Sequence, residues 1–227
     1  MRLYSGSSTQ FLDDTIHNEI GDKLKESFFQ YFRYYPSPNE VQSWRNSLRA
    51  VSQVFDYSGL NDHGVILEYQ LPQTSKRLDC MITGKDQFGS DRAVVIELKQ
   101  WEKCEVSDSE NEVVTWVGGA KREVLHPSVQ VGQYKMYLQD LHPAFDGEGS
   151  IKLDAVSYLH NYSPIEYDEL LAKKFTEKIK VNPLFCADGV DVFSEYLKEK
   201  LSAGGGLPIL DRVEKTEYKV SKKLMDH

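Results

Sequence analysis

The sequence predicts an α/β fold in which a central mixed β-sheet is flanked by helices, with a helical scaffold at the N-terminus. Two observations predict it. The first part of the chain carries apolar residues at helical spacing, and the chain from Gly64 onward carries short runs with β character. Further helical segments follow these runs, a pattern typical of α/β proteins. The length of 227 residues is sufficient to bury a core of this kind.

The scaffold is expected to consist of two helices within residues 11–56. Residues 11–35 carry one apolar stripe, because an apolar residue recurs at every fourth position. The stripe consists of Ile16, Ile20, Leu24 and Phe28. The second helix is expected to begin at residues 37–40, which place a serine, a proline and a glutamate at the N-cap, first-turn and capping-box positions. Its buried side is expected to be formed by Val41, Trp44, Leu48 and Val51.

Three strands are expected after the scaffold, at Val65–Leu71, Arg77–Thr83 and Arg92–Lys99. Residues 72–75 contain the proline, threonine and serine of a turn between the first two strands. The polar stretch 85–91 joins the second and third strands as a hairpin.

The rest of the domain is expected to alternate between strands and helices. The elements are a hairpin around Gly118-Gly119, a helix at Ser128–Leu141, a strand at Ile151–Leu159 and helices at 165–180 and 190–202. Residues 1–203 are therefore predicted to form one domain. The three glycines at 204–206 are typical of a hinge, and residues 204–227 are expected to be a polar tail or linker.

The composition excludes several classes of protein. The apolar runs are shorter than the roughly 20 residues needed to cross a bilayer, and the first residues lack the apolar region of a signal peptide. The formal net charge of −8 argues against a protein that coats nucleic acid through its overall charge, although it leaves room for local basic strips and for metal-mediated phosphate contacts. The three cysteines are widely spaced and odd in number, which suits reduced thiols in a cytoplasmic protein.

Three residues form the pattern with the clearest chemical meaning: Asp79, Glu97 and Lys99. If the hairpin loop is symmetric, Gly84 faces Arg92, and Asp79 then faces Glu97 on the neighbouring strand. Opposed side chains on one face of a sheet have Cβ atoms about 4.5–5.5 Å apart, so the two carboxylates would repel each other. A divalent cation between them would remove that repulsion, and oxygen ligands favour Mg²⁺ or Mn²⁺.

An alternative interpretation of these residues is a surface cluster of salt bridges. The same chain contains a second Glu-x-Lys, Glu217-Tyr218-Lys219, in a polar segment without an apolar strand before it, and we interpret that copy as chance. The preceding Asp79, the hairpin and the apolar strand before Glu97 favour a functional site for the first copy.

A further pair of polar residues lies on the helix predicted after Pro127. Gln130 and Tyr134 are four positions apart, so they share one face of that helix. Some nucleases use a Gln-x-x-x-Tyr helix beside their metal site to contact the substrate backbone. An ordinary half-buried helix is the alternative, since Gln133 and Tyr137 have the same spacing.

In this order, Asp79, Glu97-x-Lys99 and Gln130-x-x-x-Tyr134 resemble the motif of the PD-(D/E)XK nuclease superfamily. Longer strings resemble a bacterial group in which a nuclease-like N-terminal region precedes a Schlafen-like P-loop ATPase or helicase domain. These strings are Glu68–Asp79, Val95–Trp101, His126–Ser128 and Leu159–Tyr162. The resemblance covers residues 10 to 225 and implies a restriction-endonuclease-like fold.

The chain departs from that pattern in two ways. It has no Gly-x-x-x-x-Gly-Lys-Ser/Thr, so no ATP binding is expected, and residues 207–227 resemble the stretch that precedes the ATPase domain. The resemblance therefore implies either a fragment ending at the domain boundary or a stand-alone version. Leu78 stands where the superfamily has a proline.

The activity implied by the resemblance is metal-dependent hydrolysis of phosphodiester bonds in nucleic acid, with DNA favoured over RNA, in phage defence or nucleic-acid processing. Asp79, Glu97 and the backbone carbonyl of Leu98 would bind Mg²⁺ or Mn²⁺. Lys99 would hold the attacking water or offset charge on the phosphate. Glu68 is either a further ligand or base, or a carboxylate paired with Lys76 or Arg77.

The resemblance further implies that Gln130 and Tyr134 position the substrate. Several other residues are candidates for contacts with nucleic acid. They are Lys76, Arg77, Trp101, Lys103, Lys121, Arg122 and His126. For the basic residues the alternative is simple solvation, for Trp101 it is packing, and for His126 it is a role at the start of a helix.

Two rival functions remain open at this point. One is a non-catalytic nucleic-acid-binding module built on a nuclease fold. The other is an interaction domain that docks on a helicase or P-loop ATPase partner, in the same chain or in another one.

Overall fold

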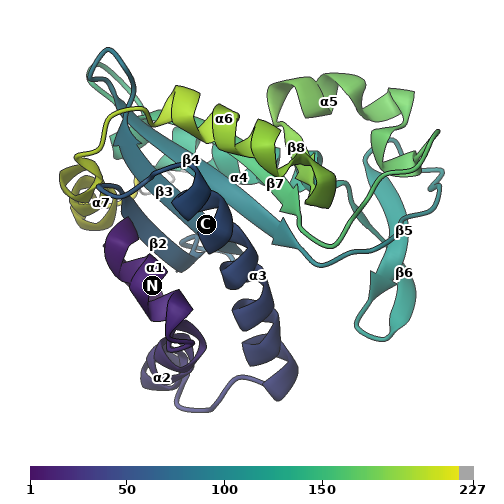
Figure 1. The fold of residues 1–227 in the computed structure, drawn as a ribbon, viewed down its shortest axis with the longest axis horizontal. Helices are drawn as coiled ribbons and strands as arrows, with labels where there is room; N and C mark the ends of the chain where they lie inside the picture. Colours follow the sequence, from purple (N-terminus) through teal and green to yellow (C-terminus); the bar gives the residue numbers. More distant parts are fainter. Residues whose placement is uncertain (220–227) are drawn as a thin grey trace, which may run out of the picture.

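The computed structural model describes residues 1–219, and it has the predicted α/β fold. A six-stranded mixed sheet in the order β1-β2-β3-β4-β7-β8 forms its centre (Figure 1). The strands are β1 (Tyr4–Ser7), β2 (Gly64–Gln70), β3 (Arg77–Lys85), β4 (Asp91–Lys99), β7 (Lys152–Leu159) and β8 (Leu184–Cys186). Neighbours from β1 to β4 are antiparallel, whereas β7 and β8 extend β4 as parallel strands.

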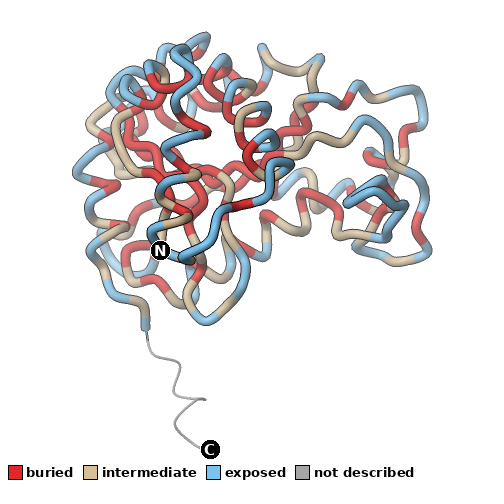
Figure 2. The backbone as a smooth tube through the Cα atoms, turned by 90° about the horizontal axis from the view of Figure 1, so that it is seen from below, coloured by how far each residue is buried: buried red, intermediate tan, exposed pale blue. Residues whose placement is uncertain are grey.

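Helices cover both faces of this sheet and bury a separate apolar core on each. The first core lies beneath α1 (Ser8–Ile16), α2 (Ile20–Phe32), α3 (Pro38–Tyr57) and α6 (Val190–Lys200). The second core lies beneath α4 (Pro127–Leu141) and α7 (Gly206–Lys215). Figure 2 shows the buried stretches of the chain running through the interior between exposed outer turns. No helix within the described residues 1–219 combines the length and apolar character that a membrane span requires.

In the described part of the chain the smaller elements are a hairpin, a short helix and four 3₁₀ turns. The hairpin is β5 (Glu112–Val117) with β6 (Ala120–Leu125), the helix is α5 (Thr176–Val181), and the turns are η1 (Pro143–Phe145), η2 (Glu169–Leu171), η3 (Lys173–Phe175) and η4 (Ala187–Gly189). The hairpin turn was expected at Gly118-Gly119, and both glycines have the positive φ, 61° and 81°, that such a turn requires.

The N-terminal scaffold is partly as expected. The Ser37 hydroxyl caps α3 by accepting a hydrogen bond from the Glu40 amide at 3.1 Å, and Pro38 is the first helical residue. The single helix expected over 11–35 is instead two helices. The chain turns at Asn18, which is left-handed with φ 59°, so that Ile16 falls outside the apolar stripe and is 75% exposed.

One other expectation for secondary structure was wrong, and two short strands were missed. Only α5 is α-helical within 165–180, because the Asp168 carboxylate accepts hydrogen bonds from the Tyr162 hydroxyl and the amides of Ile165 and Leu170 and holds a tight loop there. The edge strands β1 and β8 were not expected, since four and three residues are too short for a recognisable alternation.

The expected polar tail also contains a packed helix. Ile209, Leu210 and Val213 of α7 are buried in the second core. Gly206 lies in close contact with Gly64 and Thr83, and the Thr83 hydroxyl donates to the Gly206 carbonyl at 2.8 Å. The glycine segment is therefore a tight packing contact where a hinge was expected. Residues 220–227 of the expected tail lie outside the described residues.

Candidate active site

The expected register of the hairpin is confirmed, and it ends next to the candidate site. Gly84 pairs with Arg92, as a symmetric loop requires, and the ladder continues to the pair Cys80 and Ile96. Asp79 and Glu97 come one position later, beyond the last ladder pair. They were expected to be opposed members of the ladder, but they lie instead where the pairing of β3 and β4 ends.

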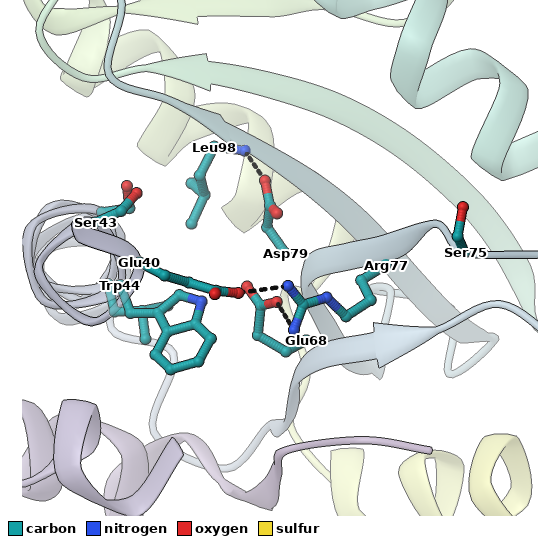
Figure 3. A pocket seen from close by; sticks show the side chains of 10 residues that line it. Glu40, Ser43, Trp44, Glu68, Ser75, Arg77, Asp79 and Leu98 are labelled. Carbon is teal, nitrogen blue, oxygen red and sulfur yellow. Dashed lines mark hydrogen bonds and ion pairs between the residues drawn. The ribbon is translucent and has the colours of Figure 1, made fainter. Parts of the chain in front are cut away.

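Asp79 points into the space between the ends of β3 and β4. Its Oδ2 accepts a hydrogen bond from the Leu98 backbone amide at 2.7 Å (Figure 3). Burial raises the pKa of this carboxyl well above its ordinary value, and the negative charges of Glu97 and Glu68 raise it further. Lys99 and the Leu98 amide act in the opposite direction. The repulsion between carboxylates that the sequence predicts thus adds to the effect of burial on this pKa.

Glu97 is buried and is held by residues from two elements. Its Oε1 accepts hydrogen bonds from Lys99 Nζ at 2.6 Å and from Gln130 Nε2 at 2.7 Å. Gln130 Nε2 also contacts the Tyr134 hydroxyl at 2.9 Å. The structure therefore brings Gln130 and Tyr134 to the acid of the Glu-x-Lys pair. The other oxygen of Glu97, Oε2, is buried without a hydrogen-bond partner among the described residues.

Lys99 stays an ammonium in this environment. Burial by itself lowers the pKa of Lys99, but the charges of Glu97 and Asp79 outweigh it, and the net pKa is raised above the ordinary value. The raised pKa favours the charged form of Lys99, which places a positive charge beside two acids.

Glu68 lies on β2 across from Asp79 of β3, between the ladder pairs Leu67–Cys80 and Tyr69–Leu78. Its backbone has an unusual conformation. Its φ of 50° is left-handed, which is strained for a residue other than glycine, asparagine or aspartate. The strain reverses the alternation of the strand, because Leu67 packs in the first core while Tyr69 packs in the second. Burial raises the pKa of Glu68 to about 7, against the lowering effect of Arg77.

Arg77 links Glu68 to the helical scaffold. Its Nη2 donates to Glu40 Oε1 at 2.6 Å, and its Nη1 lies 3.4 Å from Glu68 Oε2 (Figure 3). The alternative weighed for Glu68, a pair with a basic neighbour, is therefore the arrangement found. Arg77 was a candidate for a phosphate contact, but its charge is already matched by these two acids.

Lys76, another candidate for contact with nucleic acid, is exposed, and its Nζ lies 3.3 Å from Gln133 Oε1.

His126 is completely buried, so it does not line the cleft as was considered. Its Nδ1 accepts the Ser128 amide at 3.2 Å, and its Nε2 lies 3.0 Å from the Leu170 carbonyl. The ring therefore caps α4 and carries its proton on Nε2. His142 and Pro143 repeat this arrangement at η1, where His142 Nδ1 accepts the Ala144 amide.

The stability of the fold is expected to fall in acid because of His126. Burial lowers its pKa from 6.5 to about 4, so the neutral ring is favoured in the folded state. This stabilisation is fully present above pH 6.5 and is lost as the pH falls towards 4, by about 3 kcal/mol at most.

Urea unfolding at pH 7 and pH 4.5 tests this expectation. The free energy of unfolding should depend less on pH in His126→Asn than in the wild type. His17→Asn, which removes an exposed histidine, should retain the wild-type dependence; equal slopes in all three proteins would contradict the assignment.

The remaining candidates for nucleic-acid contact lie beyond the end of β4. Trp101 is half-buried, and Lys99 Nζ lies 5.5 Å from the centre of its ring. Lys103, Lys121 and Arg122 are exposed, and Lys121 Nζ is paired with Glu105 Oε1 at 2.5 Å. They lie around the β5–β6 hairpin and not among the carboxylates.

The structure adds residues that sequence reasoning did not single out. A cavity of about 400 Å³ lies between the carboxylate cluster and α3, and it is lined by Glu40, Ser43 and Trp44 together with Glu68 and Asp79 (Figure 3). Trp44 was expected in the core and Glu40 in the helix cap. They also line the cavity because α3 lies beside the ends of β2 and β3 that carry Glu68 and Asp79. Local sequence patterns do not indicate this packing.

The donor set fits a hard cation bound in part by a substrate. Within residues 1–219, no three His, Cys, Asp or Glu side chains converge as a ready metal cage. Mg²⁺, however, is usually bound by one or two carboxylates together with water and substrate phosphates. Asp79, the unpartnered Oε2 of Glu97 and the Leu98 carbonyl provide oxygen donors of this kind.

Comparisons with protein-family models, curated proteins and solved structures give no match for this chain. The function is therefore argued from the side chains of the site.

Proposed function

We propose that this protein is a metal-dependent nuclease of the PD-(D/E)XK type, which hydrolyses phosphodiester bonds of nucleic acid, DNA in preference to RNA. The observation that carries the proposal is the meeting of two acids and one lysine at the ends of β3 and β4. The charges of Glu97 and Lys99 act on the pKa of Asp79, those of Glu97 and Asp79 act on the pKa of Lys99, and Lys99 Nζ contacts Glu97 at 2.6 Å.

In this proposal Asp79, Glu97 and the Leu98 carbonyl hold Mg²⁺ or Mn²⁺. The metal supplies a Lewis acid that makes a bound water more acidic and stabilises charge on the phosphate. Glu68 lies close enough to raise the pKa of Asp79, and it adds negative charge to the same side of the cavity. The carboxylates stay close in spite of their repulsion because Arg77, Lys99 and the Leu98 amide hold them.

The other residues of the site orient these groups. Lys99 keeps its proton beside Glu97, so its proposed role is to hold the attacking water and to offset charge that develops on the phosphate. Gln130 fixes one oxygen of Glu97, which leaves Oε2 for the cation. Tyr134 restrains Gln130 and thereby supports the same orientation.

Removal of the metal is expected to abolish the activity. The test incubates the purified chain with supercoiled plasmid, linear duplex, single-stranded DNA and RNA, each with Mg²⁺, Mn²⁺ or a chelator. Cleavage of at least one substrate with metal, and its loss with chelator, is the expected result. Equal cleavage in chelator, or no cleavage of any substrate, would contradict the proposal, and binding without cleavage would instead favour a non-catalytic nucleic-acid-binding module.

A further inference from the structure

A second hollow begins at the end of β4 and leads away from the carboxylates. Leu98 and Lys99 line it on one side, and α3 and the β5–β6 hairpin line it on the others. Leu98 donates its amide to Asp79 and Lys99 contacts Glu97, so whatever fills this hollow lies next to the candidate active site. Figure 1 shows the hairpin projecting from the body of the molecule beyond the end of β4.

The lining of this hollow is unusual for so acidic a chain. The protein has 35 Asp and Glu residues, yet none of the described residues lining the hollow is acidic. Its side chains include two indoles, Trp101 and Trp116, and four carboxamides. The carboxamides belong to Asn39, Gln42, Asn46 and Gln100.

Three of the carboxamides are already held in place by one another. Gln42 Nε2 donates to Asn46 Oδ1 at 2.8 Å, and Asn46 Nδ2 donates to Gln100 Oε1 at 3.3 Å. Gln100 Nε2 is anchored in turn by the Ser43 hydroxyl at 2.6 Å. The Gln100 amide group is directed at Ser43 and Ser47. Each carboxamide has two donors and two acceptor lone pairs, so the spare hydrogen-bonding capacity of this chain of amides lies on Gln42 and Asn46, which use one donor each.

Trp116 is exposed but is carried by a rigid support. It is 65% exposed on β5, and the residues before it are fixed to the segment that follows β4. Thr115 Oγ1 donates to the Lys103 carbonyl at 2.6 Å, and Glu105 and Val114 exchange two backbone hydrogen bonds of 2.7 and 3.0 Å. The hairpin therefore presents a large aromatic ring to solvent from a fixed position.

We propose that this hollow binds an unpaired nucleobase of the substrate strand, which stacks on Trp116 while its edge meets the carboxamides. The inference rests on the proposed function in taking nucleic acid as the substrate. Aromatic rings stack on any base, and Asn and Gln pair with base edges. Inside a duplex both faces of a base are stacked and its Watson–Crick edge is paired, so stacking on Trp116 together with contact at that edge selects a single strand or a frayed end over a continuous duplex. The absence of acids from the described lining removes repulsion from the phosphates beside that base.

The test measures binding in chelator, where catalysis plays no part. Fluorescence anisotropy of the full chain is recorded with a labelled single-stranded DNA, an RNA of the same sequence and the matching duplex. The wild type is expected to bind the single strands more tightly than the duplex. Trp116→Ala is expected to weaken single-strand binding by roughly 5- to 150-fold, the range found when one base loses a stacking partner, and to leave duplex binding unchanged.

Phe88→Ala is the matched control, because Phe88 is 84% exposed on the β3–β4 loop outside the hollow. Equal effects of the two substitutions, preference for the duplex, or no binding of any nucleic acid would overturn the inference. Thermal unfolding of both variants verifies that they fold. Metal-dependent cleavage that is indifferent to Trp116 would reject this inference alone, whereas Trp116-dependent binding without cleavage would reject the nuclease and retain the base site.

Discussion

Asp79→Asn is expected to lower metal-dependent cleavage by at least about 100-fold and to leave the fold as stable as the wild type or more stable. Changes in groups that only orient metal ligands already cost about 10- to 100-fold, so loss of a direct ligand should cost more. The asparagine carbonyl can still accept the Leu98 amide. Neutralising the side chain also removes its repulsion with Glu97 and Glu68, the charges that raise the pKa of Asp79.

The matched control is Asp146→Asn, which alters the aspartate beside the second Glu-x-Lys of the chain. Asp146 Oδ2 pairs with Lys219 Nζ at 2.5 Å, and more than half of its side chain is exposed. This variant should cleave at the wild-type rate. The rates are measured at saturating substrate, and urea unfolding compares the stabilities. A wild-type rate in Asp79→Asn would remove the basis for the proposed site.

Gly206→Ala is expected to lower the free energy of unfolding by about 3 kcal/mol. A methyl group at this position would lie 2.2 Å from the Gly64 nitrogen and 2.2 Å from the Thr83 carbonyl oxygen. Both are backbone atoms of the neighbouring strands β2 and β3, so α7 or the adjoining ends of these strands must shift to admit it. The shift would also disturb the hydrogen bond from Thr83 to the Gly206 carbonyl.

Gly189→Ala provides the comparison for this substitution. A methyl group there has no neighbour within 4 Å, and the φ of −104° is open to any residue. The change at the start of α6 should cost less than about 1 kcal/mol. Urea unfolding followed by circular dichroism measures both variants. If Gly206→Ala were no more costly than Gly189→Ala, the glycine segment would be a flexible hinge, as the sequence alone indicates.

The elements that the sequence predicts well are those with strong local signals. The α3 cap depends on neighbouring residues, and the β3–β4 register depends on a short symmetric loop, so both are visible locally. The helix α7 was missed because the three glycines before it were interpreted as a hinge and the residues after them as a polar tail, although Ile209, Leu210 and Val213 have helical spacing. The break at Asn18 was missed because the apolar spacing continues across it.

In the candidate site, too, local features were predicted and those that depend on distant contacts were not. Sequence spacing linked Asp79, Glu97 and Lys99, and the resemblance to a nuclease motif added Gln130 and Tyr134. The structure places the last four in a single hydrogen-bond chain that Asp79 adjoins. The roles of Arg77 and His126 depended on contacts with Glu40 and Leu170, which lie far away in sequence. Pairing and burial of this kind cannot be deduced from residue type.

The left-handed backbone at Glu68 has a consequence for the whole molecule. Because β2 and β3 both change sides there, Leu67 and Cys80 contribute to one apolar core and Tyr69 and Leu78 to the other. The carboxylates therefore sit at the crossover between the two halves of the interior. Substitutions in either core that displace the backbone of β2 or β3 at this crossover are therefore expected to move the carboxylates as well.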